Sequence, residues 1–259
     1  MADRLESAIT ELAGRLVNHV VPLFSIPPGK RPVLIGTGLL VSGKSGTFLV
    51  SAKHVIDHAK PPSRLYFYSE TRELRQLTGH VRYPFTPANE KDRLDVAIVA
   101  LPKGTPTVFR SIWKIPIPLE QLAPNRIPRK SHHYLAIGFP KSRSRADPSN
   151  MQVRSEPHGF QVVSSSEASY RALGLREDSH IVMNLNIKEM RFPDGSLRPI
   201  PDPHGMSGSP LWLLFDDGGP NDPARTPVLG VVIEYHKQSN LLVATDIGIA
   251  LDLIREIDK

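Results

Sequence analysis

The hexapeptide Gly205-Met206-Ser207-Gly208-Ser209-Pro210 sets a serine between two glycines, directly before an apolar run that starts at Pro210. Glycine adopts backbone angles that other residues avoid, so a turn of this kind can expose a serine hydroxyl beside backbone N–H groups. Short runs of glycine, serine and proline also form ordinary turns. The hexapeptide therefore decides the fold only together with two segments upstream.

Each of these two apolar segments carries one polar residue that a serine nucleophile needs. Residues 47–56, TFLVSAKHVI, predict an apolar strand that delivers His54 at its end, and residues 94–101, LDVAIVAL, predict an apolar strand that begins with Asp95. A hydroxyl needs a neighbouring base to take its proton, and histidine titrates in the right range. A carboxylate on the other ring nitrogen fixes the tautomer. His54, Asp95 and Ser207 are therefore the candidate catalytic residues.

Each of these residues also has a plain structural interpretation. His54 could be a half-buried histidine at a strand end, and Asp95 could cap a strand or pair with Arg93, while Asp92 is a spare carboxylate farther from the apolar run. The three together favour the catalytic interpretation, in which Asp95 is a buried carboxylate that needs a partner. The backbone N–H groups of Gly205 and Ser207 are then the candidate oxyanion hole, which binds the negative charge that develops on the substrate.

The composition is that of a compact globular protein. The chain has 259 residues, 40% of them hydrophobic, and no cysteine, which excludes disulfides, thiol catalysis and Cys-ligated zinc. The first residues lack the basic and apolar regions of a secretory signal, and no apolar run could span a bilayer, so we expect a cytoplasmic protein with no membrane contact. The net charge of +6 comes with basic clusters at residues 126–130 and 141–145. Neither cluster interleaves aromatic residues, so we interpret them as solvated loops rather than a nucleic-acid surface.

Along the chain, short β-rich runs follow one another between two terminal helices. Apolar residues from Leu5 to Val20 recur at helical spacing and predict an amphipathic helix, docked on the body or available to a partner. A second helix is predicted near residues 249–255. Predicted strands cover residues 34–41, 47–52, 64–68, 79–83, 95–101, 134–138, 160–164, 181–185, 210–215, 228–233 and 241–245.

Many short strands without helices between them predict an all-β architecture of two barrels. We expect an N-terminal helix and linker over residues 1–30, a first barrel with His54 and Asp95 over 31–115, and a proline-rich connector over 116–130. The second barrel, with Ser207 and the C-terminal helix, is expected over 131–259. Long irregular segments at 140–158, 186–206 and 216–226 complete the pattern, and segments of this length are often functional.

Five motifs carry a resemblance to a known family: GTGLLV, LVSAKHV, LDVAIVAL, YLAIGFP and GMSGSP. Together with LGVVIEY they resemble the trypsin-like serine peptidases of the chymotrypsin fold, and the cysteine-free bacterial branch that includes the HtrA/Deg proteases more than the secreted enzymes. The chain order His54, Asp95, Ser207 is also that of this family. The resemblance implies two six-stranded β-barrels with the cleft between them, and peptide hydrolysis without a metal or an organic cofactor.

One departure from the family concerns activation. Secreted trypsins carry an aspartate before the nucleophile, which pairs with a new N-terminus after cleavage, whereas this chain has Met206 there. Ordering of the oxyanion hole must then rest on other loops, with 140–158 and 186–204 as the candidates. A protein partner that shifts these loops is one hypothesis for regulation.

Substrate preference is the least determined property. The resemblance places the base of the primary pocket near Pro201 and Asp202 and its wall at Ile233, Glu234 and Tyr235. Glu234 or Asp202 in the pocket would favour arginine or lysine in the substrate, but either could point to solvent, and Tyr235 could narrow the pocket. The remaining histidines lack the spacing of a zinc site, and His204 is interpreted as a loop residue.

The sequence therefore predicts a serine endopeptidase that acts on a protein or peptide substrate through an acyl-enzyme on Ser207. An inactive protease-like module that only binds peptides is the alternative from another class, and the presence of all three catalytic residue types argues against it. A nucleic-acid-associated protein is a weaker alternative, whose binding would depend steeply on salt.

Overall fold

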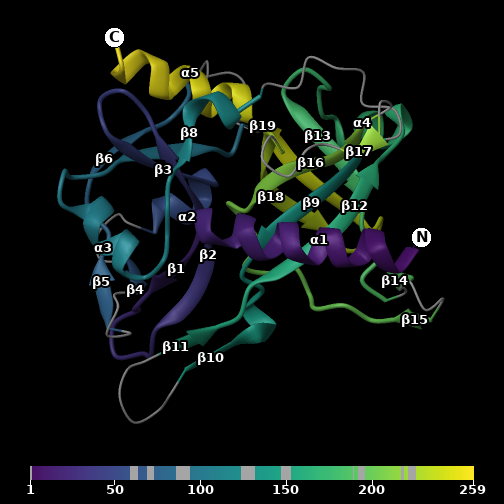
Figure 1. Ribbon diagram of the computed structural model, residues 1–259, viewed down its shortest axis with the longest axis horizontal. Helices are drawn as coiled ribbons and strands as arrows, with labels where there is room; N and C mark the ends of the chain where they lie inside the picture. The colour runs from purple at the N-terminus through teal and green to yellow at the C-terminus, as the bar shows by residue number, and fades with distance from the viewer. Residues whose placement is uncertain are drawn as a thin grey trace.

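Two β-sheets form the body of the protein and lie side by side in the computed structural model (Figure 1). The structure describes residues 2–58, 64–68, 73–85, 94–123, 132–146, 153–188, 190–191, 196–216, 219–220 and 226–259. Within these ranges, no helix is long and apolar enough to cross a membrane.

The first sheet has the strand order β5-β4-β1-β2-β3-β7-β6, with β8 added in parallel beside β2. Its strands are β1 (Val20–Ser25), β2 (Val33–Ser42), β3 (Thr47–Ser51), β4 (Leu65–Tyr68), β5 (Leu74–Gln76), β6 (His80–Arg82), β7 (Ala97–Ala100) and β8 (Ile117–Pro118). The two end strands, β5 and β6, are joined directly by residues 77–79, so the chain itself links the ends of this half-barrel. The sequence predicts five strands here and the family resemblance implies six, whereas the half-barrel has eight, because β1, β5 and β8 were not predicted.

The second sheet closes on itself as a six-stranded barrel, in the cyclic order β16-β18-β19-β13-β12-β9. The ring closes through pairing of β16 with β9. Its strands are β9 (His133–Gly138), β12 (His158–Ser164), β13 (His180–Asn184), β16 (Pro210–Asp216), β18 (Val228–His236) and β19 (Leu241–Asp246), with β17 (Gly219–Pro220) added to β16. Two small hairpins lie outside it, β10 (Ser144–Ala146) with β11 (Val153–Ser155) and β14 (Met190–Arg191) with β15 (Leu197–Arg198).

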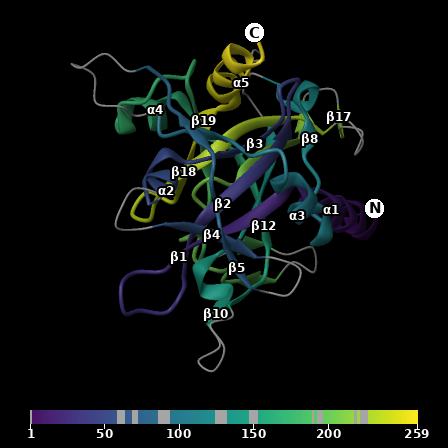
Figure 2. The ribbon, with the colours of Figure 1, turned by 90° about the vertical axis from the view of Figure 1, so that its left-hand side faces the viewer.

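Helices cover the ends and the junction of the two sheets. They are α1 (Ala2–Leu16), α2 (Lys53–Asp57), α3 (Thr105–Ser111), α4 (Glu167–Leu173) and α5 (Ile247–Ile257), with 3₁₀ turns η1 (Val17–His19), η2 (Leu119–Gln121) and η3 (Lys141–Arg143). Helix α5 lies at one end of the molecule and β10 at the opposite end in both views (Figures 1 and 2). Asp246 caps α5 by accepting a hydrogen bond from the N–H of Gly248 at 2.7 Å.

One apolar cluster joins the two halves. It contains Val41 from the first sheet, Trp212 from the second and Ile254 from α5, all buried. Leu12 and Leu16 of α1 belong to the same cluster, so the amphipathic N-terminal helix is docked on the body, in front of the second sheet in Figure 1 and ending near the middle of the molecule. Burial of this continuous surface is what holds the halves together.

The first helix is shorter than its apolar stripe predicts. It ends at Leu16, and Val20 begins β1, which pairs with β2 and β4. Pro22 cannot continue a helix, and the branched and aromatic side chains around it favour a strand. The first sheet therefore begins at residue 20, inside the segment 1–30 that was predicted as helix and linker.

The predicted strands and terminal helices agree with the all-β architecture, with one consequential difference near His54. Strand β3 ends at Ser51, and His54 lies on the short helix α2 rather than at a strand end. The ion pair of Lys53 with Asp57, at 3.0 Å, spans one turn of that helix and favours it over an extended chain.

The connector contacts both sheets where the structure describes it. Ile117 pairs with Val41 of the first sheet, and Ala123 donates to the carbonyl of Val228 in the second at 3.0 Å. Residues 124–130, with their basic cluster, lie outside the described residues.

Candidate active site

His54 and Asp95 meet on the first sheet through two hydrogen bonds. The backbone N–H of His54 donates to Oδ1 of Asp95 at 2.8 Å, and Nδ1 of its ring lies 2.5 Å from Oδ2. The backbone adds a third contact, because the N–H of Lys53 donates to the carbonyl of Asp95 at 3.2 Å. These contacts fix the orientation of the ring and direct Nε2 away from the carboxylate.

The side chain of Asp95 is 24% exposed, and that of His54 is 49% exposed. The aspartate therefore lies behind the histidine, as the sequence predicts, but is partly rather than fully buried. Asp92 and Arg93, the alternative partners considered from the sequence, lie outside the described residues.

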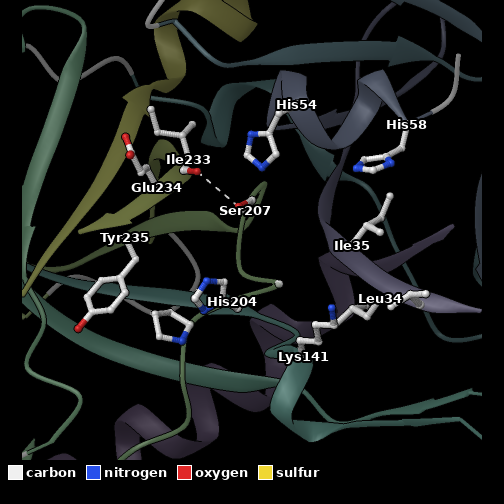
Figure 3. A pocket seen from close by; sticks show the side chains of 13 residues that line it. Leu34, Ile35, His54, His58, Lys141, His204, Ser207, Ile233, Glu234 and Tyr235 are labelled. Carbon is white, nitrogen blue, oxygen red and sulfur yellow. Dashed lines mark hydrogen bonds between the residues drawn. The ribbon is translucent and has the colours of Figure 1, made fainter. Parts of the chain in front are cut away.

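Ser207 lies on the turn that precedes β16 of the second sheet. Its Oγ donates to the carbonyl of Ile233 at 3.4 Å, and Nε2 of His54 points toward it across the cleft (Figure 3). The hydroxyl of Ser207 thus adopts a rotamer in which it donates its proton to the carbonyl of Ile233 and not to the ring of His54. Catalytic hydrogen bonds are often long or unformed without a substrate and tighten when one is bound.

The turn around Ser207 depends on two glycines in the left-handed region. Gly205 has φ +95° and Gly208 has φ +89°. A Cβ at Gly205 would lie 2.7 Å from the carbonyl oxygen of Phe139 and 2.9 Å from the amide nitrogen of Lys141. Only glycine satisfies both the angle and the space at position 205.

The backbone of this turn directs the N–H groups of Gly205 and Ser207 in a defined way. The carbonyl of His204 accepts from the N–H of Lys141 at 2.6 Å, and the carbonyl of Met206 accepts from that of Ser209 at 2.8 Å. In a trans peptide the C=O and the following N–H point in opposite directions, so the amides of Gly205 and Ser207 face away from these partners. Within the described residues neither amide donates a hydrogen bond, so both can donate to a ligand.

Met206 fastens the turn to the second barrel through packing. Its side chain is 1% exposed and belongs to the apolar core of that barrel, where Ser209 Oγ lies 3.8 Å from its sulfur. A charged residue at this position would need a buried counter-ion, whereas methionine fills the space without one.

Ser207 and His54 line a cleft of about 420 Å³ between the two sheets. Figure 3 shows one wall formed by Ile233, Glu234 and Tyr235 of β18. The rest of the lining comes from Val33, Leu34, Ile35, His58, Lys141, Pro203, His204 and Gly205.

The residues predicted to bind substrate separate into two groups. Ile233, Glu234 and Tyr235 line the cleft, whereas Asp202 does not. Oε2 of Glu234 lies 3.1 Å from Nε2 of His236, and its side chain is exposed. The hydroxyl of Tyr235 lies 3.3 Å from the carbonyl of Leu185, which holds the ring in place.

Asp202 is engaged by its own loop. It accepts a hydrogen bond from the N–H of His204 at 3.0 Å and another from the ring of that histidine. Burial raises the pKa of Asp202, but the hydrogen bonds from His204 and the charge of Lys237 outweigh it and hold the pKa below its usual value. Burial and the charge of Asp202 together raise the pKa of Tyr235.

Several residues of the site escaped the sequence analysis. Leu34, His58 and Lys141 line the cleft, and so does His204, which was interpreted as a loop residue. Lys141 directly follows the YLAIGFP motif, and His58 lies one helical turn after His54. Closeness in sequence to a motif was therefore the signal that could have identified these two residues as part of the site. In the part of the chain that the structure describes, no three histidine, aspartate or glutamate side chains are grouped to hold a metal ion.

Comparison of the whole chain with known proteins gives similarity in structure and none in sequence. No protein-family profile and no curated protein sequence matches. A thermostable serine protease, AL20, from an extremophilic microorganism matches with a TM-score of 0.55 and 15% identity, over 93% of this chain and 97% of that one. Neuropsin, a serine protease of mouse brain, matches with a TM-score of 0.55 and 16% identity, over 93% of this chain and 95% of that one. The protein therefore has the two-barrel fold of the trypsin-like serine proteases.

Proposed function

We propose that the protein is a serine endopeptidase that cleaves peptide bonds through an acyl-enzyme on Ser207. The observation that carries the proposal is the position of Ser207 in one cleft with the ring of His54, whose Nδ1 is hydrogen-bonded to Asp95. The fold, shared with serine proteases of low sequence identity, supports a protease-like activity.

In the proposed acylation, Nε2 of His54 takes the proton of Ser207 as Oγ attacks the substrate carbonyl. The oxygen of that carbonyl becomes an oxyanion and accepts hydrogen bonds from the amides of Gly205 and Ser207. Asp95 remains ionised and stabilises the imidazolium. His54 then gives its proton to the leaving amine, and the carbon–nitrogen bond breaks to leave an ester on Ser207.

Deacylation repeats the same steps with water. His54 takes a proton from the water molecule, whose oxygen attacks the ester carbonyl, and the protonated histidine then returns a proton to Oγ of Ser207. The products are a carboxylic acid and the regenerated hydroxyl. No step calls for a group beyond these side chains, the two amides and water.

The free edge of β18 offers a place for the acyl part of the substrate. Strand β18 pairs with β16 only as far as Val231, and with β19 along its other edge as far as His236. Among the described residues, no strand pairs with the cleft-side edge beyond Val232. An extended peptide can add to such an edge as a further strand.

Among the described residues that line the cleft, Glu234 is the one with an acidic side chain. We propose it, rather than Asp202, as the source of any preference for lysine or arginine in the substrate. Asp202 already accepts two hydrogen bonds from His204 and does not line the cleft. The pairing of Glu234 with His236 and its exposure limit the preference to a modest one.

We propose that a protein partner regulates the site through the hydrogen bond from the N–H of Lys141 to the carbonyl of His204. That hydrogen bond joins the start of the 140–158 segment to the peptide that carries the amide of Gly205. A protein that moved Lys141 would release this peptide and disable the proposed oxyanion hole. The cytoplasmic location and the kinship with bacterial HtrA/Deg proteases remain predictions from the sequence.

The proposal is tested by incubating the protein with an unstructured substrate such as casein and mapping new chain termini by mass spectrometry. We expect cleavage that the Ser207→Ala variant abolishes at unchanged thermal stability. Peptides bound equally by both proteins and cut by neither would instead support the inactive binding module.

A further inference from the structure

Thr37 is a buried threonine of the first sheet that contacts the nucleophile turn of the second. It lies in β2, its side chain is 0% exposed, and it lies outside the cleft lining. Its backbone N–H donates to the carbonyl of Ser207 at 2.8 Å. Its Oγ1 donates to the carbonyl of Gly205 at 3.0 Å. One residue therefore holds the carbonyls of both residues whose amides form the proposed oxyanion hole.

The hydroxyl of Thr37 has a second partner, because it also accepts a hydrogen bond from the N–H of Phe139 at 3.2 Å. Phe139 precedes Pro140 and Lys141, and the N–H of Lys141 binds the carbonyl of His204. The peptides on both sides of Gly205 are thus fixed, on one side through Lys141 and on the other through Thr37. Oγ1 uses its single proton on Gly205 and a lone pair on Phe139, so both functions of the hydroxyl are satisfied.

Thr37 is itself held in place from behind. Its carbonyl accepts a hydrogen bond from Ser51 Oγ at 2.6 Å. A Cβ at Gly208 would lie 2.0 Å from that carbonyl oxygen, and a Cβ at Gly138 would lie 2.9 Å from Oγ1. The backbone of Gly208 therefore approaches the carbonyl of Thr37 closely, and that of Gly138 approaches its Oγ1.

We propose that the Thr37 hydroxyl is a positioning group that orders the oxyanion turn from the first barrel. This inference rests on the proposed function of Ser207. The position before the nucleophile holds Met206, which packs into the second barrel but has no charge to offer for an ion pair, so hydrogen bonds add to this packing in orienting the turn. Thr37 supplies two of them, and removing its hydroxyl leaves the carbonyl of Gly205 and the N–H of Phe139 unsatisfied.

If the Thr37 hydroxyl had a purely structural role, its removal should have the same effect on activity as the removal of any other buried threonine hydroxyl. Thr245 of β19 provides the comparison, because it is 0% exposed and its Oγ1 is buried with no hydrogen-bond partner within the described residues. Thr245→Val removes a hydroxyl that holds nothing, whereas Thr37→Val removes one that holds the turn. The two substitutions change side-chain volume equally.

The experiment compares Thr37→Val, Thr37→Ser, Thr37→Ala and Thr245→Val with the wild-type protein. The rate of fluorophosphonate labelling, kcat and KM on a cleaved peptide, and hydrogen exchange across residues 203–209 are measured for each. For Thr37→Val we expect labelling and kcat to fall about 10- to 100-fold, the size typical of a small misplacement at a catalytic centre, with KM little changed. Exchange of the turn should accelerate. Thr37→Ser should remain close to wild type, and Thr245→Val should change none of these quantities.

Thr37→Ser and Thr37→Ala lack the same methyl group and differ only in the hydroxyl, so they decide the matter even if the valine variant does not fold. Equal labelling rates and equal exchange in Thr37→Ser and Thr37→Ala would overturn the proposal. So would an equal loss in Thr37→Val and Thr245→Val. A wild-type protein that is never labelled would refute the proposed function instead, and the exchange of the turn would still report whether Thr37 positions it.

Discussion

The carboxylate of Asp95 holds His54 at two points, with Oδ2 lying 2.5 Å from the ring nitrogen Nδ1 and Oδ1 accepting the backbone N–H at 2.8 Å. The second contact ties the carboxylate to helix α2 itself, so the ring and the backbone that carries it are oriented together. An amide at position 95 can accept one of these hydrogen bonds but presents an N–H group to the other. The pair is therefore sensitive to a substitution that barely changes shape.

Asp95→Asn should lower kcat by about 10³- to 10⁴-fold, because the amide favours the wrong tautomer of His54; the upper value is that measured for the corresponding substitution in the chymotrypsin-type template. The thermal midpoint should change little. The measurement is kcat on a cleaved peptide together with thermal unfolding. Asp57→Asn, on the same helix but paired with Lys53, serves as the control and should keep kcat within a few-fold of wild type. Equal losses in the two variants would contradict the assigned role of Asp95.

Gly205→Ala should remove activity by at least about 100-fold and lower the free energy of unfolding by roughly 1–3 kcal/mol. The added methyl would lie 2.7 Å from the carbonyl oxygen of Phe139, and φ +95° is strained for alanine. Activity assays and denaturant unfolding measure the two effects. Gly104→Ala is the matched control, since nothing lies within 4 Å of its added Cβ and its φ is −80°. A Gly205→Ala protein with normal activity would exclude the proposed oxyanion hole.

Glu234→Gln should reduce kcat/KM for peptides with lysine or arginine at the acyl side of the cleaved bond by about two- to fivefold, the range of an exposed ion pair. Peptides with an uncharged residue there should be unaffected, and the difference should shrink at high salt. Asp202→Asn tests the alternative acid and should leave the ratio between the two substrates unchanged. A larger effect of Asp202→Asn than of Glu234→Gln on this ratio would show that Asp202, and not Glu234, determines the preference.

Acid should destabilise the folded protein through His158. Burial, and then the charge of Arg143, lowers the pKa of this histidine from 6.5 to about 4. Between these two values the unfolded chain binds more protons than the folded one, so stability falls as the pH is lowered from 6.5 to 4. In denaturant unfolding across this range, the wild type should lose more stability than His158→Gln as the pH falls. Parallel curves would show that His158 is protonated as readily in the folded chain as in the unfolded one.

Strand positions and the candidate catalytic residues could be predicted because their signals are local. Strands such as β3 and β7 are short apolar runs, and the turn at Ser207 is marked by adjacent glycines. Strand β1 was missed because Val20 continues the helical spacing of α1, and only Pro22 interrupts it. His54 was placed on a strand because the five-residue helix α2 is too short to produce a periodic pattern.

The supports of the site could not be predicted, because they join distant parts of the chain. The hydrogen bond from Thr37 to Gly205 spans 168 positions, and that from Phe139 to Thr37 spans 102. Nothing near Thr37 in the sequence distinguishes its hydroxyl from that of Thr245, which is equally buried and bonds nothing among the described residues. The difference exists only once the two barrels are packed against each other.

Covalent labelling of Ser207 by a fluorophosphonate tests the central claim most directly, because the reagent reacts with a serine hydroxyl activated by a neighbouring base. Intact-protein and peptide mass spectrometry should find one adduct, on Ser207, that is lost in Ser207→Ala and strongly slowed in His54→Ala. A folded wild-type protein that acquires no adduct, or acquires it on another residue, would contradict the account.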